Sequence, residues 1–264
     1  IHWTAQNNIP YLVFGGGSNL LVRDGGIRGL VICLSDMAGD LRWRETPQEV
    51  IVTAGAGVPT KRLCVLALKH GWQGMNFALG IPGSLGGAIQ MNAGTARGCI
   101  TDVLSSVTVM TGAAETERIA RDQLQVKYRG LQWPAHIQRR LGQTIVLTAE
   151  FRLTMADRED VRRQARQFMR ARARKLPSWE PSAGCFFKNP SARMPAGRLI
   201  DESGLKGLCV GQAQVSSRHA NFIINRGSAT ADDVIRLVEQ IRKKVNTKYG
   251  IDLQPEVRIV GEEI

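Results

Sequence analysis

The most constraining feature of this sequence is a glycine-rich stretch from Gly80 to Gly94, which reads Gly-Ile-Pro-Gly-Ser-Leu-Gly-Gly-Ala-Ile-Gln-Met-Asn-Ala-Gly. It holds five glycines and one proline in 15 residues and carries no charge. Because each glycine costs a helix or strand roughly 1 kcal/mol relative to alanine, we expect a loop here. Such backbone turns sharply or approaches a ligand closely, with N–H groups directed at anionic oxygen.

A second glycine cluster, Gly15-Gly16-Gly17-Ser18-Asn19, follows the apolar run from Tyr11 to Phe14. Two glycine-rich turns in the first half of the chain suggest a ligand that carries a diphosphate. The alternative is that both are tight surface turns. The sequence contains no Gly-x-Gly-x-x-Gly, Gly-Lys-Ser/Thr or His-Glu-x-x-His motif, so we expect no Rossmann unit around a nucleotide.

Size and cysteine usage indicate a globular protein of two or three units. The chain has 264 residues, 43% of them hydrophobic, and a mean hydropathy of −0.14. No apolar run is long enough to span a membrane. The cysteines are scattered without a Cys-x-x-Cys pair, so we expect no metal site, no disulfide framework and a reducing cytoplasm. Because the sequence begins with Ile1 and not Met, we also expect an upstream segment.

The formal charge of +12 makes a basic nucleic-acid-binding protein one alternative. Eight basic residues lie between Arg158 and Lys175, and the acidic residues Asp157, Glu159 and Asp160 stand at the start of that segment. A helix macrodipole favours this polarity. Aromatic residues make up only 6% of the chain and are not interleaved with the bases. A solvated helix face is therefore the interpretation that we favour.

The order of expected elements indicates an α+β protein without repeats. We expect strands at 27–34, 50–54 and 145–153, a hairpin of 103–110 and 115–119 around Thr111-Gly112, and a final strand at 251–260. We expect helices at 60–70, capped by Thr60 and ended by Gly71, at 158–175, and from Thr230 to Gly250. The proline-rich segment 177–195 predicts a domain boundary.

An ordered set of motifs along nearly the whole chain resembles the UDP-N-acetylenolpyruvoylglucosamine reductases, flavoproteins of peptidoglycan precursor synthesis. The motifs are Phe14-Gly-Gly-Gly-Ser-Asn-Leu-Leu21, Gly80-Ile-Pro-Gly-Ser84, Met91-Asn-Ala-Gly94, Tyr128-Arg129, Ser182-Ala-Gly-Cys-Phe-Phe-Lys-Asn-Pro190, Ala196-Gly-Arg-Leu-Ile-Asp201, His219-Ala-Asn-Phe-Ile-Ile-Asn225 and Gln254-Pro-Glu-Val-Arg258. Any one of them is weak, and the ordered set is specific. The short stretch between Arg129 and Cys185 resembles the subclass without an extra tyrosine-bearing loop.

The resemblance implies an α+β fold with a vanillyl-alcohol-oxidase (PCMH) type FAD-binding domain of two subdomains and an α+β substrate-binding domain. We expect the FAD-binding domain at 1–154, with subdomains of about 1–36 and 37–154. A connecting basic helix at 155–176 and a substrate-binding domain at 177–250 follow. A C-terminal strand at 251–264 then carries Glu256. Family members usually begin with a further stretch that completes the first flavin subdomain.

The resemblance also implies two cofactors and their binding residues. FAD would be held through its diphosphate, and NADPH would reduce the flavin before the UDP-linked enolpyruvyl sugar enters the same pocket. The expected FAD-binding residues are Gly15, Gly16, Gly17, Ser18, Asn19, Gly83, Ser84, Gly86, Gly87 and Asn92. The expected substrate-binding residues are Tyr128, Asn189, Lys206 and His219. His219 alone could equally be a structural histidine.

Three residues match the family's catalytic positions. Hydride arriving on the terminal carbon of the enol ether leaves carbanion character beside a carboxylate, which positive charge and hydrogen-bond donors stabilise. Arg129 matches the arginine for this role and Glu256 its partner glutamate. Cys185 matches the proton donor, which is serine in many members. Taken alone, these residues could be a surface arginine, a glutamate paired with Arg258 and a packed thiol. A serine that is common two places after the arginine is replaced here by Leu131.

We therefore predict an NADPH-dependent, FAD-containing reductase of UDP-N-acetylglucosamine enolpyruvate, a UDP-N-acetylmuramate dehydrogenase. We expect a cytoplasmic monomer that binds neither nucleic acid nor membrane. A sister flavin oxidoreductase with the same FAD domain is the nearest enzymatic alternative, and the basic nucleic-acid-binding protein is the non-enzymatic one.

Overall fold

The computed structural model describes residues 1–37, 39, 41–111, 114–138, 144–177 and 180–263. The chain divides into two compact units, and each is described here by itself. The first unit comprises Ile1–Gly17 and Gly29–Arg170, and the second comprises Ser18–Arg28 and Ala171–Ile264. Both units combine helices with sheets, which confirms the predicted α+β class.

A six-stranded sheet with the order β10-β9-β13-β5-β4 organises the first unit, and β6 also pairs with β13. Every one of these pairings is antiparallel. The predicted hairpin is present as β9 and β10, although Gly112 of its turn lies outside the described residues. The strands are β4 (Arg42–Glu45), β5 (Glu49–Gly55), β6 (Trp72–Gln73), β9 (Leu104–Met110), β10 (Thr116–Ala120) and β13 (Ile145–Met155).

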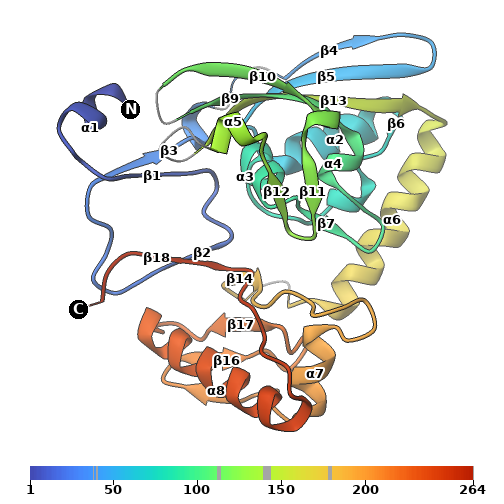
Figure 1. Cartoon of the computed structure of the whole chain (residues 1–264). Coiled ribbons are helices and arrows are strands. Elements are labelled where there is room, and N and C mark those ends of the chain that lie inside the picture. The colour runs from blue at the N-terminus through green and yellow to red at the C-terminus, as the bar shows by residue number, and fades with distance from the viewer. Residues whose placement is uncertain (38, 40, 112–113, 139–143, 178–179, 264) are drawn as a thin grey trace. The chain divides into compact units, whose positions relative to one another are not determined.

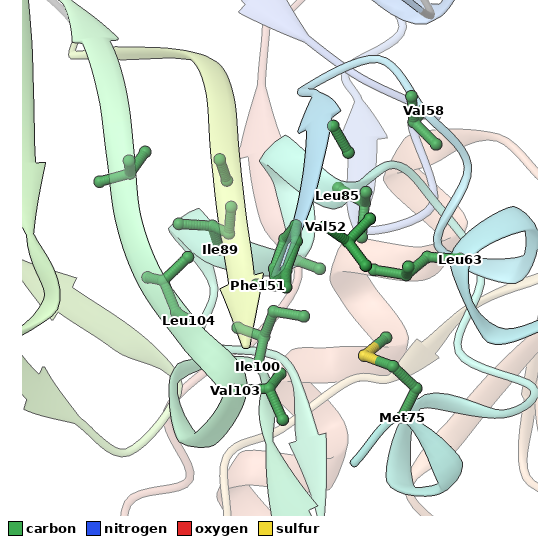
Figure 2. Packing of buried hydrophobic residues seen from close by; sticks show 14 of the residues in the cluster. Val52, Val58, Leu63, Met75, Leu85, Ile89, Ile100, Val103, Leu104 and Phe151 are labelled. Carbon is green, nitrogen blue, oxygen red and sulfur yellow. The ribbon is translucent and has the colours of Figure 1, made fainter. Parts of the chain in front are cut away.

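Three helices lie against one face of this sheet (Figure 1), namely α2 (Thr60–His70), α3 (Leu85–Gln90) and α4 (Ile100–Val103). The core of the unit forms between them and the sheet. Phe151 of β13 lies at its centre and is fully buried, with apolar side chains from the helices around it (Figure 2). Those side chains include Leu63 of α2, Leu85 and Ile89 of α3, and Ile100 of α4.

Shorter elements complete the first unit. Strands β1 (Tyr11–Phe14) and β3 (Leu30–Cys33) pair in parallel. Strands β11 (Gln125–Lys127) and β12 (Gly130–Gln132) form a tight antiparallel hairpin. The remaining elements are α1 (His2–Gln6), η1 (Ser35–Met37), η2 (Asn76–Ala78), β7 (Gly94–Thr95), β8 (Gly98–Cys99), η3 (Arg121–Gln123) and α5 (Ala135–Gln138). Helix α6 (Arg158–Lys175) begins in this unit and ends in the second.

The second unit contains a four-stranded antiparallel sheet with the order β14-β17-β16-β15 and two helices. Its core includes Leu237, Ile241 and Val245, one face of the long helix α8. Strands β2 and β18 form a separate parallel pair. The elements are β2 (Leu20–Val22), β14 (Ser182–Cys185), α7 (Ala196–Glu202), β15 (Cys209–Val210), β16 (Ala213–Val215), β17 (Phe222–Asn225), α8 (Ala231–Tyr249) and β18 (Arg258–Val260).

The predicted helix signals are confirmed at α8 and in part at α2. Thr230 caps α8 by accepting a hydrogen bond from the Asp233 amide, and Gly250 ends the helix at a φ of +68°. Gly71 ends α2 in the same left-handed conformation. The predicted cap at Thr60 is wrong, because Pro59 is the N-cap residue and Thr60 is the first helical residue. The buried Thr60 hydroxyl has no hydrogen-bond partner among the residues that the structure describes.

Two further expectations need correction. The stretch Gly80–Gly94 is not all loop, because Leu85–Gln90 forms α3 despite its two glycines. The final strand is also shorter than predicted, since β18 covers only Arg258–Val260. Glu256 therefore lies just before that strand.

Charged residues of α6 follow the predicted polarity, with Glu159 and Asp160 in the first turn and Arg172, Arg174 and Lys175 in the last. Ion pairs within the helix join Arg162 to Glu159 and Arg163 to Asp160. Across the part of the chain that the structure describes, no helix combines the length and the apolar character needed to cross a bilayer.

Candidate functional site

The two glycine clusters predicted from the sequence lie in contact within the first unit. A Cβ atom added to Gly15 would lie 1.9 Å from Ser84 Oγ, and one added to Gly16 would lie 3.0 Å from Gly83 Cα. The two turns can therefore approach this closely only because these side chains are absent. Gly83 has a φ of +103° and Gly17 a φ of +64°, conformations that glycine adopts readily.

Helix α3 begins at the second of these turns. Ser84 is its N-cap and accepts a hydrogen bond from the Gly87 amide at 3.4 Å. Gly86 faces the sheet, where an added Cβ would lie 2.7 Å from Ala56 Cβ. Gly87 is exposed, and its added Cβ would meet Ser84 Oγ at an ordinary 3.6 Å. Gly86 thus serves the packing of α3, whereas Gly87 leaves backbone open to solvent.

These observations fit a diphosphate-bearing cofactor. The Leu85 and Gly86 amides at the start of α3 already donate to the Val58 and Ala56 carbonyls at 2.8 Å. The glycines of the two turns, which are in contact, have amides that no side chain of their own shields. Such amides bind anionic oxygen well. The fit rests on the close approach of Gly15 to the Ser84 side chain and of Gly16 to the Gly83 backbone, which larger residues would hinder.

Asn19, the last residue of the first cluster, has its contacts in the second unit. Its side-chain Nδ2 donates to the Glu256 carbonyl at 3.0 Å, and its own carbonyl accepts from the Arg258 amide at 3.0 Å. Ser18 is half-buried beside it. The asparagine therefore fixes the backbone of a predicted catalytic residue.

Arg129 lies in the two-residue turn between β11 and β12. Lys127 pairs with Gly130 across this hairpin, so Tyr128 and Arg129 form the turn itself. Arg129 has a φ of +56°, which is uncommon for a residue with a side chain. Its guanidinium lies 5.1 Å from the centre of the Tyr128 ring, a cation–π contact. Tyr128 is exposed.

Asn92 is buried at the end of α3, and its amide contacts protein groups at both ends. Nδ2 donates to the Lys127 carbonyl at 3.0 Å, and Oδ1 accepts from the Thr101 hydroxyl at 2.9 Å. The side chain that we expected to bind FAD therefore links α3 to the hairpin that carries Arg129.

The segments that carry Cys185 and Glu256 pair in the second unit. Phe187 and Pro255 form an antiparallel bridge, in which the Glu256 amide donates to the Phe186 carbonyl at 2.7 Å and the Lys188 amide donates to the Gln254 carbonyl at 2.9 Å. Cys185, at the end of β14, and Glu256 are both half-buried. Two predicted catalytic residues thus lie on neighbouring segments joined by backbone hydrogen bonds.

Asn221 holds the segment after Cys185 in place. Its Oδ1 accepts from the Phe187 amide at 2.9 Å, its Nδ2 donates to the Phe187 carbonyl at 2.8 Å, and its carbonyl accepts from the Phe186 amide at 2.7 Å. Asn221 is only 3% exposed. The sequence motif from His219 to Asn225 contains Asn221, but the motif alone gave this residue no role. Its place between an expected site histidine and an apolar strand was the sequence feature that could have indicated one.

His219 lies in a positive part of the second unit. Its Nδ1 accepts from the Asn221 amide at 3.3 Å, which leaves the proton of the neutral ring on Nε2. Burial, and then the positive charges of Lys206 and Lys175, lower the pKa of His219. Lys206 pairs with Asp201 at 2.6 Å. A neutral donor near two lysines suits an anionic group.

Asn189 is the expected substrate residue with the clearest structural contact. Its Oδ1 accepts from the Ala196 amide at 3.0 Å and so satisfies the first turn of α7. The residue is otherwise exposed. The structure thus groups Asn189, Lys206, His219, Cys185 and Glu256 in the second unit, and Tyr128, Arg129 and most of the glycine positions in the first.

Comparison with known proteins gives these residues a context. Residues 1–120 match the model of a family described as FAD binding domain. Residues 176–260 match the C-terminal domain of UDP-N-acetylenolpyruvoylglucosamine reductase. The chain therefore contains an FAD-binding domain followed by a reductase-type C-terminal domain.

Individual relatives agree with the two family matches. The chain is 43% identical to a UDP-N-acetylenolpyruvoylglucosamine reductase of Desulfosudis oleivorans over 97% of this chain and 82% of the relative. It is 39% identical to one from Syntrophus aciditrophicus over 100% and 82%. The crystal structure of the Thermus caldophilus enzyme superimposes with a TM-score of 0.80 at 35% identity, covering 97% of this chain and 88% of that one. The chain belongs to the UDP-N-acetylenolpyruvoylglucosamine reductase family.

Proposed function

We propose that this chain reduces the enolpyruvyl group of UDP-N-acetylglucosamine enolpyruvate with NADPH and a bound FAD, giving UDP-N-acetylmuramate for peptidoglycan synthesis. The observation that carries the proposal is the pairing of the Cys185 and Glu256 segments in the second unit, by a 2.7 Å hydrogen bond from the Glu256 amide to the Phe186 carbonyl. It would present a proton donor and a carboxylate together. NADPH and one proton are consumed, and the carbon–carbon double bond becomes a single bond.

FAD, when bound, accepts a hydride from NADPH and delivers it to the substrate. The residues that would hold it are the glycine turns, namely Gly15, Gly16, Gly17, Ser18, Gly83, Ser84 and Gly87. The contact between the two turns supports this assignment. Gly86 supports the site through its packing on Ala56, and Asn19 through its contact with the Glu256 carbonyl.

Arg129 is proposed to stabilise the negative charge that develops beside the substrate carboxylate when hydride reaches the terminal carbon. A fixed guanidinium acts strongly on charge that is absent in the ground state. Arg129 has a positive φ, a conformation that persists only where the surrounding structure maintains it. This supports the proposal that the position of Arg129 matters for the reaction.

Cys185 is proposed to donate the proton that completes the reduction at the carbon next to the carboxylate. Cysteine thiols have an ordinary pKa of about 8.5 and therefore carry a proton at neutral pH. Glu256 is proposed to orient the substrate carboxylate end. Each proposal rests on the family motif and on the pairing of the two segments through the bridge between Phe187 and Pro255, which we call the Cys185–Glu256 ladder.

Lys206, His219, Asn189 and Tyr128 are proposed to hold the UDP-sugar. The positive charges near the neutral His219 support a site for the diphosphate, with the Nε2 proton as a donor.

We also propose that 1–154 and 177–250 are the FAD-binding and substrate-binding domains, joined by the helix at 155–176. We propose further that the enzyme is a cytoplasmic monomer without affinity for nucleic acid. A sister flavin oxidoreductase is disfavoured because residues 176–260 match the reductase domain.

An anaerobic absorbance experiment tests the proposal. The purified protein should show the absorbance of oxidised flavin, lose it on addition of NADPH and regain it on addition of the enolpyruvyl sugar nucleotide. The recovered product should be the lactyl ether. Flavin that bleaches with NADPH but stays reduced in the presence of the substrate would contradict the proposed substrate. A protein that contains no flavin and binds none when FAD is added would contradict the cofactor assignment.

A further inference from the structure

We propose that Asn92, supported by Thr101, is a positioning residue for the hairpin turn that carries Arg129. This inference rests on the proposed function, since it gives Asn92 a part in placing the arginine that acts on the substrate. It assigns to Asn92 a role different from the cofactor contact that we expected from its motif.

The hairpin turn needs an external support. It consists of only Tyr128 and Arg129 between the paired residues Lys127 and Gly130. Arg129 takes a φ of +56°, a left-handed conformation that costs a residue with a Cβ roughly 1–2 kcal/mol. Within the turn Tyr128 is exposed and Arg129 is half-buried, and Lys127 before it is exposed. Two short strands of three residues each do not by themselves hold such a turn rigid.

Asn92 contacts this hairpin at the residue that enters the turn. Its Nδ2 donates to the Lys127 carbonyl at 3.0 Å, two residues before Arg129. The asparagine itself is 4% exposed and is held by its own backbone amide, which donates to the Ile89 carbonyl of α3. A buried, fixed donor thus contacts Lys127, the residue directly before the turn, and restricts the position from which the turn starts.

Thr101 completes the support from the other side. Its hydroxyl donates to Asn92 Oδ1 at 2.9 Å, so the orientation of the amide is determined. Thr101 is 3% exposed and lies in α4, where its carbonyl accepts from Arg121 Nε at 2.9 Å. The chain of contacts therefore runs from α4 through Thr101 and Asn92 to the hairpin.

Asparagine suits this position for two physical reasons. Asn92 has a φ of +42°, and asparagine tolerates the left-handed region better than most residues with a Cβ. Its amide also donates at one end and accepts at the other, which neither aspartate nor leucine can do. With the amide occupied by Lys127 and Thr101, placement of the hairpin explains the residue without a cofactor contact.

The consequence for catalysis is specific. Loosening the turn leaves Arg129 present but imprecisely placed, and misplacement of a catalytic group by about 1 Å can cost about 100-fold in rate. The loss should fall on the step in which substrate reoxidises the reduced flavin. Flavin reduction by NADPH, which does not need the arginine's charge opposite the substrate carboxylate, should change little.

The test compares Asn92→Gly, Thr101→Val and Thr101→Ser with the parent holoenzyme and with Arg129→Ala. Glycine retains the left-handed backbone and removes only the side chain. Gln90→Ala is the matched control, because Gln90, the last residue of α3 and two residues before Asn92, donates to a different backbone carbonyl, that of Thr144, at 2.7 Å. Stopped-flow absorbance measures each half-reaction per bound flavin, and hydrogen exchange of the peptide over residues 125–132 reports on the turn.

We expect Asn92→Gly to slow reoxidation by substrate about 10- to 100-fold at saturating substrate, with an unchanged KM and nearly normal NADPH reduction. Thr101→Val should give a smaller loss that Thr101→Ser restores. Exchange in 125–132 should rise in Asn92→Gly and Thr101→Val and stay at the parent level in Thr101→Ser and Gln90→Ala.

Normal exchange and normal reoxidation in Asn92→Gly would overturn the proposal. So would loss of flavin with normal rates per remaining flavin, since that result identifies a cofactor contact. If Arg129→Ala itself reoxidised at the parent rate, the proposed role of Arg129 would fail; the exchange measurement would still decide whether Asn92 positions the turn. Should Asn92→Gly not fold, the Thr101 pair decides by the same measurements.

Discussion

The glycine turns of the first unit and the Cys185–Glu256 ladder of the second are built on opposite principles. In the turns, Gly15 and Gly16 leave out side chains so that two backbone segments can touch. In the ladder, backbone hydrogen bonds join the segments around Phe187 and Pro255, and the proposed chemistry belongs to the side chains of Cys185 and Glu256.

The difference predicts different kinds of sensitivity. The turns should be damaged by adding atoms at Gly15 and Gly16, because a Cβ there enters space that the Ser84 side chain or the Gly83 backbone occupies. The ladder should be damaged by removing atoms, because its alignment depends on groups such as the Asn221 amide. Binding through backbone and chemistry through side chains can therefore be separated by mutation.

The largest expected effect is on the ladder, from Asn221→Ala. The change leaves the Phe187 N–H and C=O buried without their partner, and an unsatisfied buried group costs about 1–3 kcal/mol. We expect a loss of about 2–6 kcal/mol in the free energy of unfolding for the two groups together, measured by urea denaturation.

Asn225→Ala is the matched control for this variant. Asn225 lies at the other end of β17, and its Oδ1 accepts from the amides of Gly227 and Ala229 in a largely exposed segment, where water can replace it. Its loss in unfolding free energy should be clearly smaller. Equal losses in the two variants would mean that the Asn221 contacts do not hold the ladder.

Gly15→Ala tests the turns. The added Cβ would lie 1.9 Å from Ser84 Oγ and 3.0 Å from Ser84 Cβ, so Ser84 must give up its N-cap contact or the two turns must separate. Overpacking typically costs about 1–3 kcal/mol, which corresponds to roughly 5- to 150-fold weaker flavin binding if the bound conformation carries the cost. Flavin content after purification and a titration with FAD measure the effect.

Gly87→Ala sharpens this test because it adds a methyl group without a clash inside the protein. Alanine is also the better helix former in α3. Weaker flavin binding by a variant whose fold is as stable as the parent's would locate the cofactor at the first turn of α3. Full flavin content in both variants would contradict the assignment of the turns.

A smaller effect is expected from the titration of His219. Its pKa is lowered, so the unfolded chain binds a proton at a higher pH than the folded protein does. The free energy of unfolding should therefore fall as the pH drops through about 6.5, and His219→Gln should lack this part of the slope. NMR titration of the His219 ring should give a midpoint below that value. A ring midpoint at or above it would contradict the cause that we assign.

Much of the fold could be predicted because its signals are local. The helix α8 has its cap at Thr230, its apolar face and its terminal Gly250 within one segment. The hairpin β9–β10 follows from alternation on either side of one turn. In each case the residues that determine the element are its own neighbours in sequence.

The elements that escaped prediction depend on distant partners. Helix α3 contains two glycines, and its formation is understandable only from the contact between Gly86 and Ala56. Strand β2 is three residues long and pairs with β18 from the far end of the chain. Local propensity contains no information on either contact.

The sequence predicted which residues belong to the candidate site but not how they are arranged in space. Motifs indicated the two glycine turns and Cys185 with Glu256, and the structure adds that the members of each pair touch or share a ladder. The supporting amides of Asn19, Asn92 and Asn221 could not be assigned from sequence, because an asparagine beside a motif looks the same whether it contacts a ligand or a carbonyl.

The central claim, that the ladder serves substrate chemistry while the turns serve the cofactor, is tested most directly by measuring the two half-reactions in Cys185→Ala and Cys185→Ser. Stopped-flow absorbance follows flavin reduction by NADPH and then reoxidation by the enolpyruvyl substrate. We predict that the alanine variant keeps its flavin, is reduced by NADPH at close to the parent rate and stalls on the substrate. The serine variant should recover much of the second step, because a hydroxyl can donate from the same position. Reoxidation of the alanine variant at the parent rate would contradict the claim and leave Cys185 as a packed thiol.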